Sequence, residues 1–269
     1  MMRRATRAGA RVIIGLVIAA NAGAGGCRSG EAEAPSAPAW EVVSEGPGRG
    51  SLDPAVAGER AGSGVRRFAR VGEGEPGHIC IEEAPDPEGA ASGALAWVST
   101  RRACDATGVS GADEPLSVAH LRQDAAGSIA LSHSVERGDG VVTWFEPALV
   151  IVPAGLGAGE VTTQELRMIV RPIGKPGVIR HQGRARHEIT HVGEDVVRLR
   201  GGEPMKATHV RLVLTADLGL PKVRVVTDRW YVAGVGLVGE RIQERATTLG
   251  LTVRSVDEQW VLDAPGAAR

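Results

Sequence analysis

Apolar and polar residues alternate along much of this chain, and a period of two is the pattern of a half-buried β-strand. The alternation is clearest over 205–214, whose apolar face contains Val210, Leu212 and Leu214. His209 and Arg211 fall on the opposite face. The same rule applied to 128–135 gives a face with Ile129, Leu131, His133 and Val135. No stretch combines a helical apolar pattern with capping residues, although 239–249 is compatible with a short helix or a long strand.

Short apolar runs separated by Gly, Pro and Asp clusters continue this pattern from about Val65 onward. Such spacing is typical of antiparallel strands joined by turns. The predicted strands begin at Val65, His78, Ala94, Leu116, Ser128, Val141, Val161, Val178, Val196, Ala207, Val223, Val235 and Glu258. We therefore expect a mainly β domain over 63–265, built as a large curved antiparallel sheet or half-barrel with little helix.

The segment 1–26 has the pattern of a secretory signal peptide. It has a basic start, an apolar run over 12–20 and a tail of small residues. The apolar run is too short to span a bilayer, which takes about 20 residues. The sequence therefore predicts export.

The residues that end this segment carry a second prediction. Ala24, Gly25, Gly26 and Cys27 resemble the lipobox of bacterial lipoproteins, in which the cysteine is lipidated and becomes the first residue. Cleavage after Ala22 is the alternative. The resemblance implies a membrane anchor. Because no aspartate follows Cys27, it also implies the periplasmic face of the outer membrane rather than the inner membrane.

Cysteine parity supports lipidation. The chain has three cysteines, and an odd cysteine in an exported protein needs an explanation. With lipid on Cys27, Cys80 and Cys104 remain as a pair that an oxidising compartment can bridge.

Composition separates a linker from the β domain and excludes one class of partner. Residues 27–62 are rich in Gly, Ala, Pro, Ser and Glu, so we expect a flexible linker. A short apolar interruption at 40–43 is a candidate for docking on the domain. Without 1–26, the remaining 243 residues contain 27 basic and 32 acidic side chains, a net charge of −5. That charge does not fit nucleic-acid binding.

The segment His187-Glu188-Ile189-Thr190-His191 matches the zinc-protease motif H-E-x-x-H. A shared zinc requires a helix, because residues four apart then lie on one face. On a strand, the two histidines are about 13 Å apart. Nearby glycines and the β-branched residues in and beside the motif favour a strand, with His181 on the same face as both histidines. We therefore predict no metal or other cofactor, and keep as an alternative a zinc hydrolase using His187, Glu188 and His191, with a third ligand such as Glu240.

The C-terminal third carries a resemblance to a group of proteins. Residues 230–238 read Trp-Tyr-Val-Ala-Gly-Val-Gly-Leu-Val. They are similar to a motif of secreted bacterial β-sheet proteins and lipoproteins related to the lipoprotein-carrier (LolA-like) half-barrel group. Further similarity lies in 145–159 and 193–210, and the resemblance spans about 125–245. In physical terms, Gly234 and Gly236 permit a sharp bend between strands, which Trp230 and Tyr231 anchor.

These observations define the expected function. We predict a lipoprotein of the cell envelope without enzymatic activity, which presents a β-sheet face to a lipid, a peptide or a protein. A purely structural or assembly module is the alternative, and it would lack a pocket of the few hundred Å³ typical of ligand sites.

Overall fold

The computed structural model describes residues 40–46, 52, 65–71, 77–86, 89, 95–105, 114–199 and 202–263. The predicted signal peptide, Cys27 and most of the predicted linker lie outside these residues. No helix that could cross a bilayer occurs in the part of the chain that the structure describes.

The described residues form thirteen strands, which confirms the mainly β prediction. The strands are β1 (Trp40–Gly46), β2 (Val65–Val71), β3 (His78–Pro85), β4 (Leu95–Cys104), β5 (Ser117–Gln123), β6 (Ile129–Glu136), β7 (Val141–Val152), β8 (Val161–Pro172), β9 (His181–Leu199), β10 (Pro204–Asp217), β11 (Pro221–Val232), β12 (Gly236–Thr248) and β13 (Leu251–Leu262). The strand predicted to start at Val178 begins at His181 and continues through Val196, where a separate strand was predicted, as one long strand, β9. The ambiguous segment 239–249 falls almost entirely in β12.

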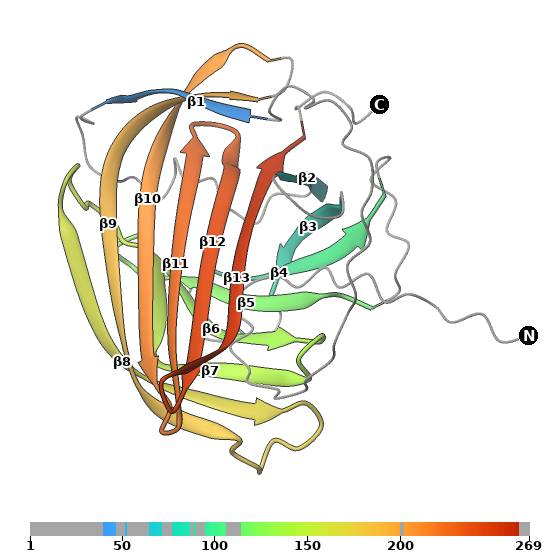
Figure 1. Cartoon of the computed structure of the whole chain (residues 1–269). Coiled ribbons are helices and arrows are strands. Elements are labelled where there is room, and N and C mark those ends of the chain that lie inside the picture. The colour runs from blue at the N-terminus through green and yellow to red at the C-terminus, as the bar shows by residue number, and fades with distance from the viewer. Residues whose placement is uncertain are drawn as a thin grey trace, which may run out of the picture.

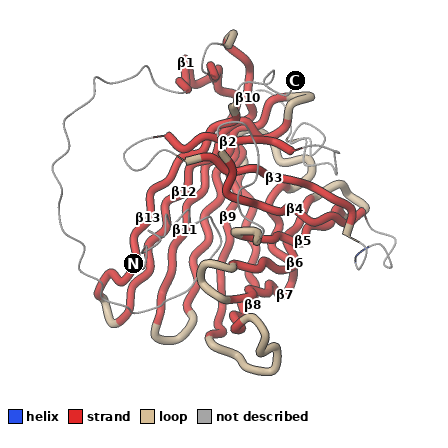
Figure 2. Tube along the Cα trace, turned by 90° about the vertical axis from the view of Figure 1, so that its right-hand side faces the viewer, coloured by secondary structure: helices blue, strands red, loops and turns tan. Residues whose placement is uncertain are grey.

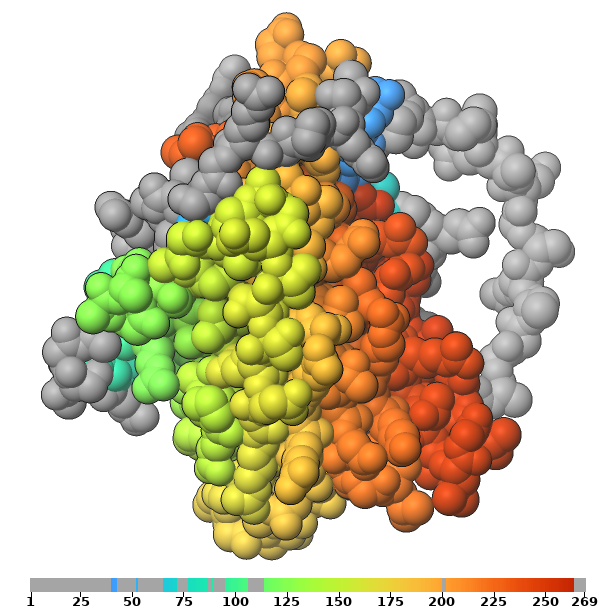
Figure 3. Space-filling view, turned by 90° about the vertical axis from the view of Figure 1, so that its left-hand side faces the viewer, coloured from blue at the N-terminus to red at the C-terminus, as the bar shows by residue number. Residues whose placement is uncertain are grey.

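The curved sheet closes on itself instead of stopping at a half-barrel. Consecutive strands pair antiparallel from β2 to β13, β13 pairs with β2, and β8 pairs with β9. Long strands from β8 to β13 curve around one side, and the shorter β2 to β6 cross the other (Figures 1 and 2). The outer faces of β8 to β11 lie side by side over one surface of the molecule (Figure 3).

Alternation in the sequence becomes an inner and an outer face of this barrel. Val210, Leu212 and Leu214 of β10 are buried, whereas Arg211 between them is exposed. The largest fully buried side chains come from most of the strands: Trp97, Trp260, Tyr231, Phe68, Ile79, Ile129, Leu131, Met168, Ile189, Leu199 and Ile242. The apolar face predicted from the 205–214 pattern is therefore a core face.

A β-bulge overturns the predicted face of His133. The register passes from His120↔His133 to Leu121↔Leu131, so Ser132 is an extra residue and the alternation changes phase. Ser134 and Glu136 consequently join Leu131 among the buried residues. The His133 ring instead stacks between His120, at 3.9 Å between centroids, and the half-exposed Trp144, at 4.1 Å. A period-two pattern cannot show a bulge, which explains the error.

Strand β1 lies outside the closed barrel and extends its wall. It pairs with the C-terminal part of β9, from Trp40↔Leu199 to Gly46↔Glu194, beyond the part of β9 that pairs with β8. The Trp40 ring meets Trp230 edge-on at 4.7 Å. A Cβ atom at position 239 would lie only 3.1 Å from the Trp40 ring. The lack of a side chain at Gly239 therefore leaves room for this ring. Residues 40–46 thus belong to the sheet although they lie inside the predicted linker 27–62.

Candidate functional site

The H-E-x-x-H segment lies on β9, and its geometry differs from that of a zinc protease. His187 and His191 are buried with Ile189 between them, whereas Glu188 points outward and pairs with Arg186 at 2.9 Å. The His191 Nδ1 atom is 3.0 Å from the Leu156 carbonyl oxygen. Burial, followed by the charge of Arg229, lowers the pKa of His187 to about 4. Within the described residues, no three His, Cys, Asp or Glu side chains are arranged to hold a metal ion.

The motif at 230–238 forms the end of β11 and the turn into β12. Gly234 and Gly236 have φ angles of 75° and 86°, a region that favours glycine. Tyr231 and Trp230 are both buried, on opposite faces of β11 because they are adjacent in a strand. Trp230 donates its indole N–H to Asp195 at 2.7 Å.

A network of polar side chains lies next to Trp40 and Trp230 on the outer face. His209 lies 3.1 Å from Asp195 through Nδ1 and 3.0 Å from Asp228 through Nε2, and its ring stacks on Trp230. Arg211 donates to the same Asp228 oxygen at 2.7 Å. These contacts link β9, β10 and β11 next to the Trp40 side chain, so we assign this network of polar side chains a structural role.

The barrel interior contains a buried ionic triad that the sequence analysis did not predict. Glu240 accepts from Arg229 Nε at 2.8 Å and from Arg101 Nη1 at 3.1 Å, and it is 2% exposed. Burial alone would raise the pKa of Glu240, but the two guanidinium groups lower it below its usual value. Glu240 is therefore engaged by arginine and does not act as the third zinc ligand of the alternative hypothesis.

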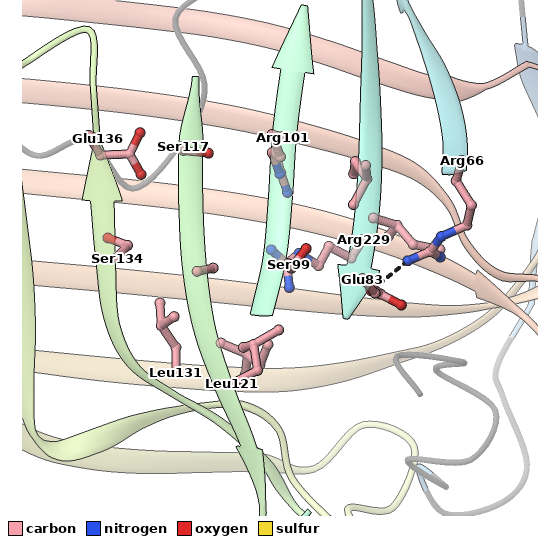
Figure 4. A pocket seen from close by; sticks show the side chains of 14 residues that line it. Arg66, Glu83, Ser99, Arg101, Ser117, Leu121, Leu131, Ser134, Glu136 and Arg229 are labelled. Carbon is pink, nitrogen blue, oxygen red and sulfur yellow. Dashed lines mark hydrogen bonds and ion pairs between the residues drawn. The ribbon is translucent and has the colours of Figure 1, made fainter. Parts of the chain in front are cut away.

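A small cavity lined by both polar and apolar side chains adjoins this triad (Figure 4). Its volume is about 60 Å³, far below the few hundred Å³ of a typical ligand pocket. The polar side chains around it are Arg66, Glu83, Ser99, Arg101, Ser117, Ser134, Glu136 and Arg229. Arg66 donates to Glu83 at 2.8 Å through Nη2. A cavity of this volume has no room for a lipid chain.

A second group of interior charges predicts how stability depends on pH. Glu244 is buried, 3.1 Å from Arg254. Burial raises the pKa of Glu244 to about 7; Arg254 opposes this, while Asp139 and Glu258 add to it.

We expect Glu244→Gln to stabilise the protein at pH 8 by about 2 kcal/mol and to change stability little near pH 4.5. A folded-state pKa above the unfolded value gives stability that is present below about 4.5 and is lost as the pH rises through about 7. Urea unfolding of both proteins across this range measures the difference. Parallel pH curves would contradict the assignment. Glu188→Gln, at a partly exposed position on the outer face, is the control.

An open groove lies on the outer wall where β7 and β8 separate. Their pairing runs from Val141↔Pro172 only to Glu146↔Arg167, so beyond that point β8 pairs with β9 alone. The Gln164 side chain bridges the gap: its oxygen accepts from Val150 N–H at 3.0 Å, and its nitrogen donates to the Ala148 carbonyl at 2.8 Å. The groove has a volume of about 790 Å³, and it is lined by Glu146, Glu165, Leu166, Arg167, Gln182, Gly183 and Arg184.

Cys80 and Cys104 form a disulfide in the structure, with 5.8 Å between their Cα atoms. The bond joins neighbouring strands β3 and β4, because Cys104 pairs in register with His78, two residues from Cys80.

Comparison with known proteins identifies no family for this chain. No protein-family model matches it, and no curated protein matches it. One solved structure that matches is from Bacteroides fragilis and is described as an inferred exported protein with a YmcC-like fold. The two chains share 13% identity with a TM-score of 0.40, over 79% of this chain and 97% of the other.

Proposed function

We propose that this chain is an exported, lipid-anchored module of the cell envelope that binds an extended polypeptide segment on its outer wall and has no catalytic activity. The observation that carries the proposal is the difference in volume between the interior cavity and the outer groove. The interior cavity of about 60 Å³ is too small for a lipid, whereas the outer groove of about 790 Å³ has the size of a ligand site.

The edge of β8 supports a polypeptide as the occupant. Over 161–166, β8 pairs with β9 on one side, and its other side faces the gap from β7. A strand edge of this kind binds an extended peptide through main-chain hydrogen bonds. Arg167 and Arg184 line the groove beside Glu146 and Glu165, so the groove offers charges of both signs to the peptide's side chains.

The remaining parts of the proposal rest on the sequence and on β9. The segment 1–26 and Cys27 support export and a lipid anchor. Glu188 points away from His187 and His191, which supports a role without zinc catalysis.

Selection of short random peptides on the immobilised protein tests the proposal. The selected peptides should bind Arg167→Glu/Arg184→Glu at least about tenfold more weakly, about 1.4 kcal/mol. They should bind the control Arg224→Glu/Arg245→Glu normally, because Arg224 and Arg245 are exposed on β11 and β12, outside the groove. Hydrogen exchange should slow over 161–166 when the peptide binds. Equal loss in both double variants, or a co-purifying lipid seen by native mass spectrometry with no selected peptide, would contradict it.

A further inference from the structure

Three β-hairpin turns lie side by side at one end of the barrel. They are 173–180 between β8 and β9, 218–220 between β10 and β11, and 249–250 between β12 and β13. The last two are neighbours, because Pro221 after one turn pairs with Thr248 before the other. The first lies beside them, because Asp217 at the end of β10 pairs with Arg184 near the start of β9. The turns therefore form a row at the end of the barrel opposite β1 (Figures 1 and 2).

These hairpins carry the most exposed large apolar side chains of the described residues. Leu249, Leu251 and Leu220 are 82%, 73% and 66% exposed. Leu220 and Leu249 line the same pocket between two of the turns, so they belong to one patch. Further exposed apolar side chains in the three hairpins are Val178, Ile179 and Val253. Single exposed apolar residues are common, but a cluster of them marks a surface that contacts a membrane or another molecule.

The backbone at Leu249 indicates that folding does not favour a leucine there. Because Thr248 pairs with Leu251, Leu249 and Gly250 form a two-residue turn, and their φ angles are 51° and 82°. Such a turn favours Asn or Asp before Gly, since a bulky side chain is strained at positive φ. Among the described residues, Leu249 is the one non-glycine residue with a positive φ. Its exposed side chain gains little from burial, so a contact outside the chain explains it better.

The charges beside the leucines are mainly positive. Lys175 and Arg180 lie in the β8–β9 turn, Lys222 follows the β10–β11 turn, and all three are exposed. Asp217, which is 3.7 Å from Lys222, is the one acidic residue within 173–180, 217–222 and 247–254. Basic side chains beside exposed apolar ones match a bilayer, in which anionic headgroups lie above hydrocarbon.

We propose that this row of turns docks on a lipid bilayer with anionic headgroups. Leu220, Leu249 and Leu251 insert among the acyl chains, and Lys175 and Lys222 contact the headgroups. A row of separate convex turns suits a deformable lipid surface, whereas a protein partner would need a matching pocket for each leucine. The contact goes beyond the proposed function, because neither the lipid anchor nor the peptide groove requires it.

Flotation with lipid vesicles tests the contact, using the full chain with Cys27→Ser so that no lipid anchor is present. We expect binding to vesicles of phosphatidylcholine mixed with phosphatidylglycerol, and at least about fivefold weaker binding to phosphatidylcholine alone. The triple variant Leu220→Asn/Leu249→Asn/Leu251→Thr should bind the mixed vesicles at least about tenfold more weakly. The segment 1–26 is the same in every variant, so it cannot produce this difference.

Two variants separate docking from folding. The matched control Leu95→Asn/Val161→Thr removes exposed apolar side chains on β4 and β8, outside the turns, and should bind normally. Leu249→Asn alone should bind several-fold more weakly and yet melt at a higher temperature, because Asn tolerates positive φ better than Leu. Weaker binding by this variant therefore cannot result from unfolding.

A polarity-sensitive fluorophore locates the contact. On Cys27→Ser/Leu249→Cys, its emission should brighten and shift to the blue when vesicles are added. On Cys27→Ser/Thr163→Cys, an exposed position on β8 far from the turns, it should not change. No vesicle binding, equal binding by the triple variant, or unchanged emission at position 249 would overturn the proposal. A dimer that the triple variant abolishes, seen by sedimentation velocity without any vesicle binding, would also overturn it and assign the turns to a second copy of the chain.

Discussion

Replacing Glu240 with glutamine is expected to destabilise the barrel by about 3–5 kcal/mol. The carboxylate is 2% exposed and binds Arg101 on β4 and Arg229 on β11 from its position on β12. Loss of its charge leaves two buried guanidinium groups without this carboxylate. Because a typical domain is stable by only about 5–15 kcal/mol, this single substitution removes much of the margin.

Urea unfolding of Glu240→Gln, followed by tryptophan fluorescence, measures the effect. Glu188→Gln is the control: its ion pair with Arg186 is solvent-exposed, so its loss should cost less than about 1 kcal/mol. The triple variant Arg101→Met/Glu240→Leu/Arg229→Met should recover most of the stability, because it removes all three charges together. A Glu240→Gln protein as stable as Glu188→Gln would show that the triad does not form.

Acid should reveal the same triad. Burial opposes ionisation of Glu240, but Arg101 and Arg229 lower its pKa below the ordinary value. A depressed folded-state pKa gives stability that is present above about 4.5 and is lost as the pH falls through the lower folded value. The destabilisation of Glu240→Gln relative to wild type should therefore shrink at low pH. The difference expected for Glu244→Gln also shrinks there, but it has the opposite sign, because that substitution stabilises the protein at high pH.

Much of the fold was predictable, because one face of nearly every strand is buried. The alternation over 205–214 correctly placed Leu212 and Leu214 in the core, and the strand prediction for the H-E-x-x-H segment correctly predicted its conformation. Closure was not predictable, since pairing of β8 with β9 depends on strand tilt and register, which the alternation does not encode. The outward position of His133 was missed for a similar reason, as a bulge leaves no mark on a period-two pattern.

The candidate sites were less predictable than the fold. A signal for the interior charges does exist: Arg229 falls in phase with Val223 and Val225 on the inner face of β11. An arginine at a core position of a strand indicates a buried ion pair, although the sequence does not show that its partner is Glu240. The groove left no such signal, because it depends on where β7 and β8 separate and on the Gln164 bridge.

Loss of the Cys80–Cys104 disulfide is expected to lower the free energy of unfolding by about 3.5 kcal/mol. The two cysteines are 24 residues apart in the sequence, and closing a loop of this length in the unfolded chain costs about that much entropy. Reduction of the wild-type protein, or the double substitution Cys80→Ala/Cys104→Ala, should therefore lower the melting temperature by several degrees.

Thermal unfolding with and without reductant measures the loss, and thiol titration of the native protein tests the bond directly. The double variant is the control, because reductant should not change its melting temperature further. Two titratable thiols in a native protein made from residue 28 onward would contradict the bond. If Cys80 and Cys104 pair with each other, Cys27 has no cysteine partner within the chain. That arrangement is the one that lipidation of Cys27 requires, so mass spectrometry for a lipid on Cys27 completes the test.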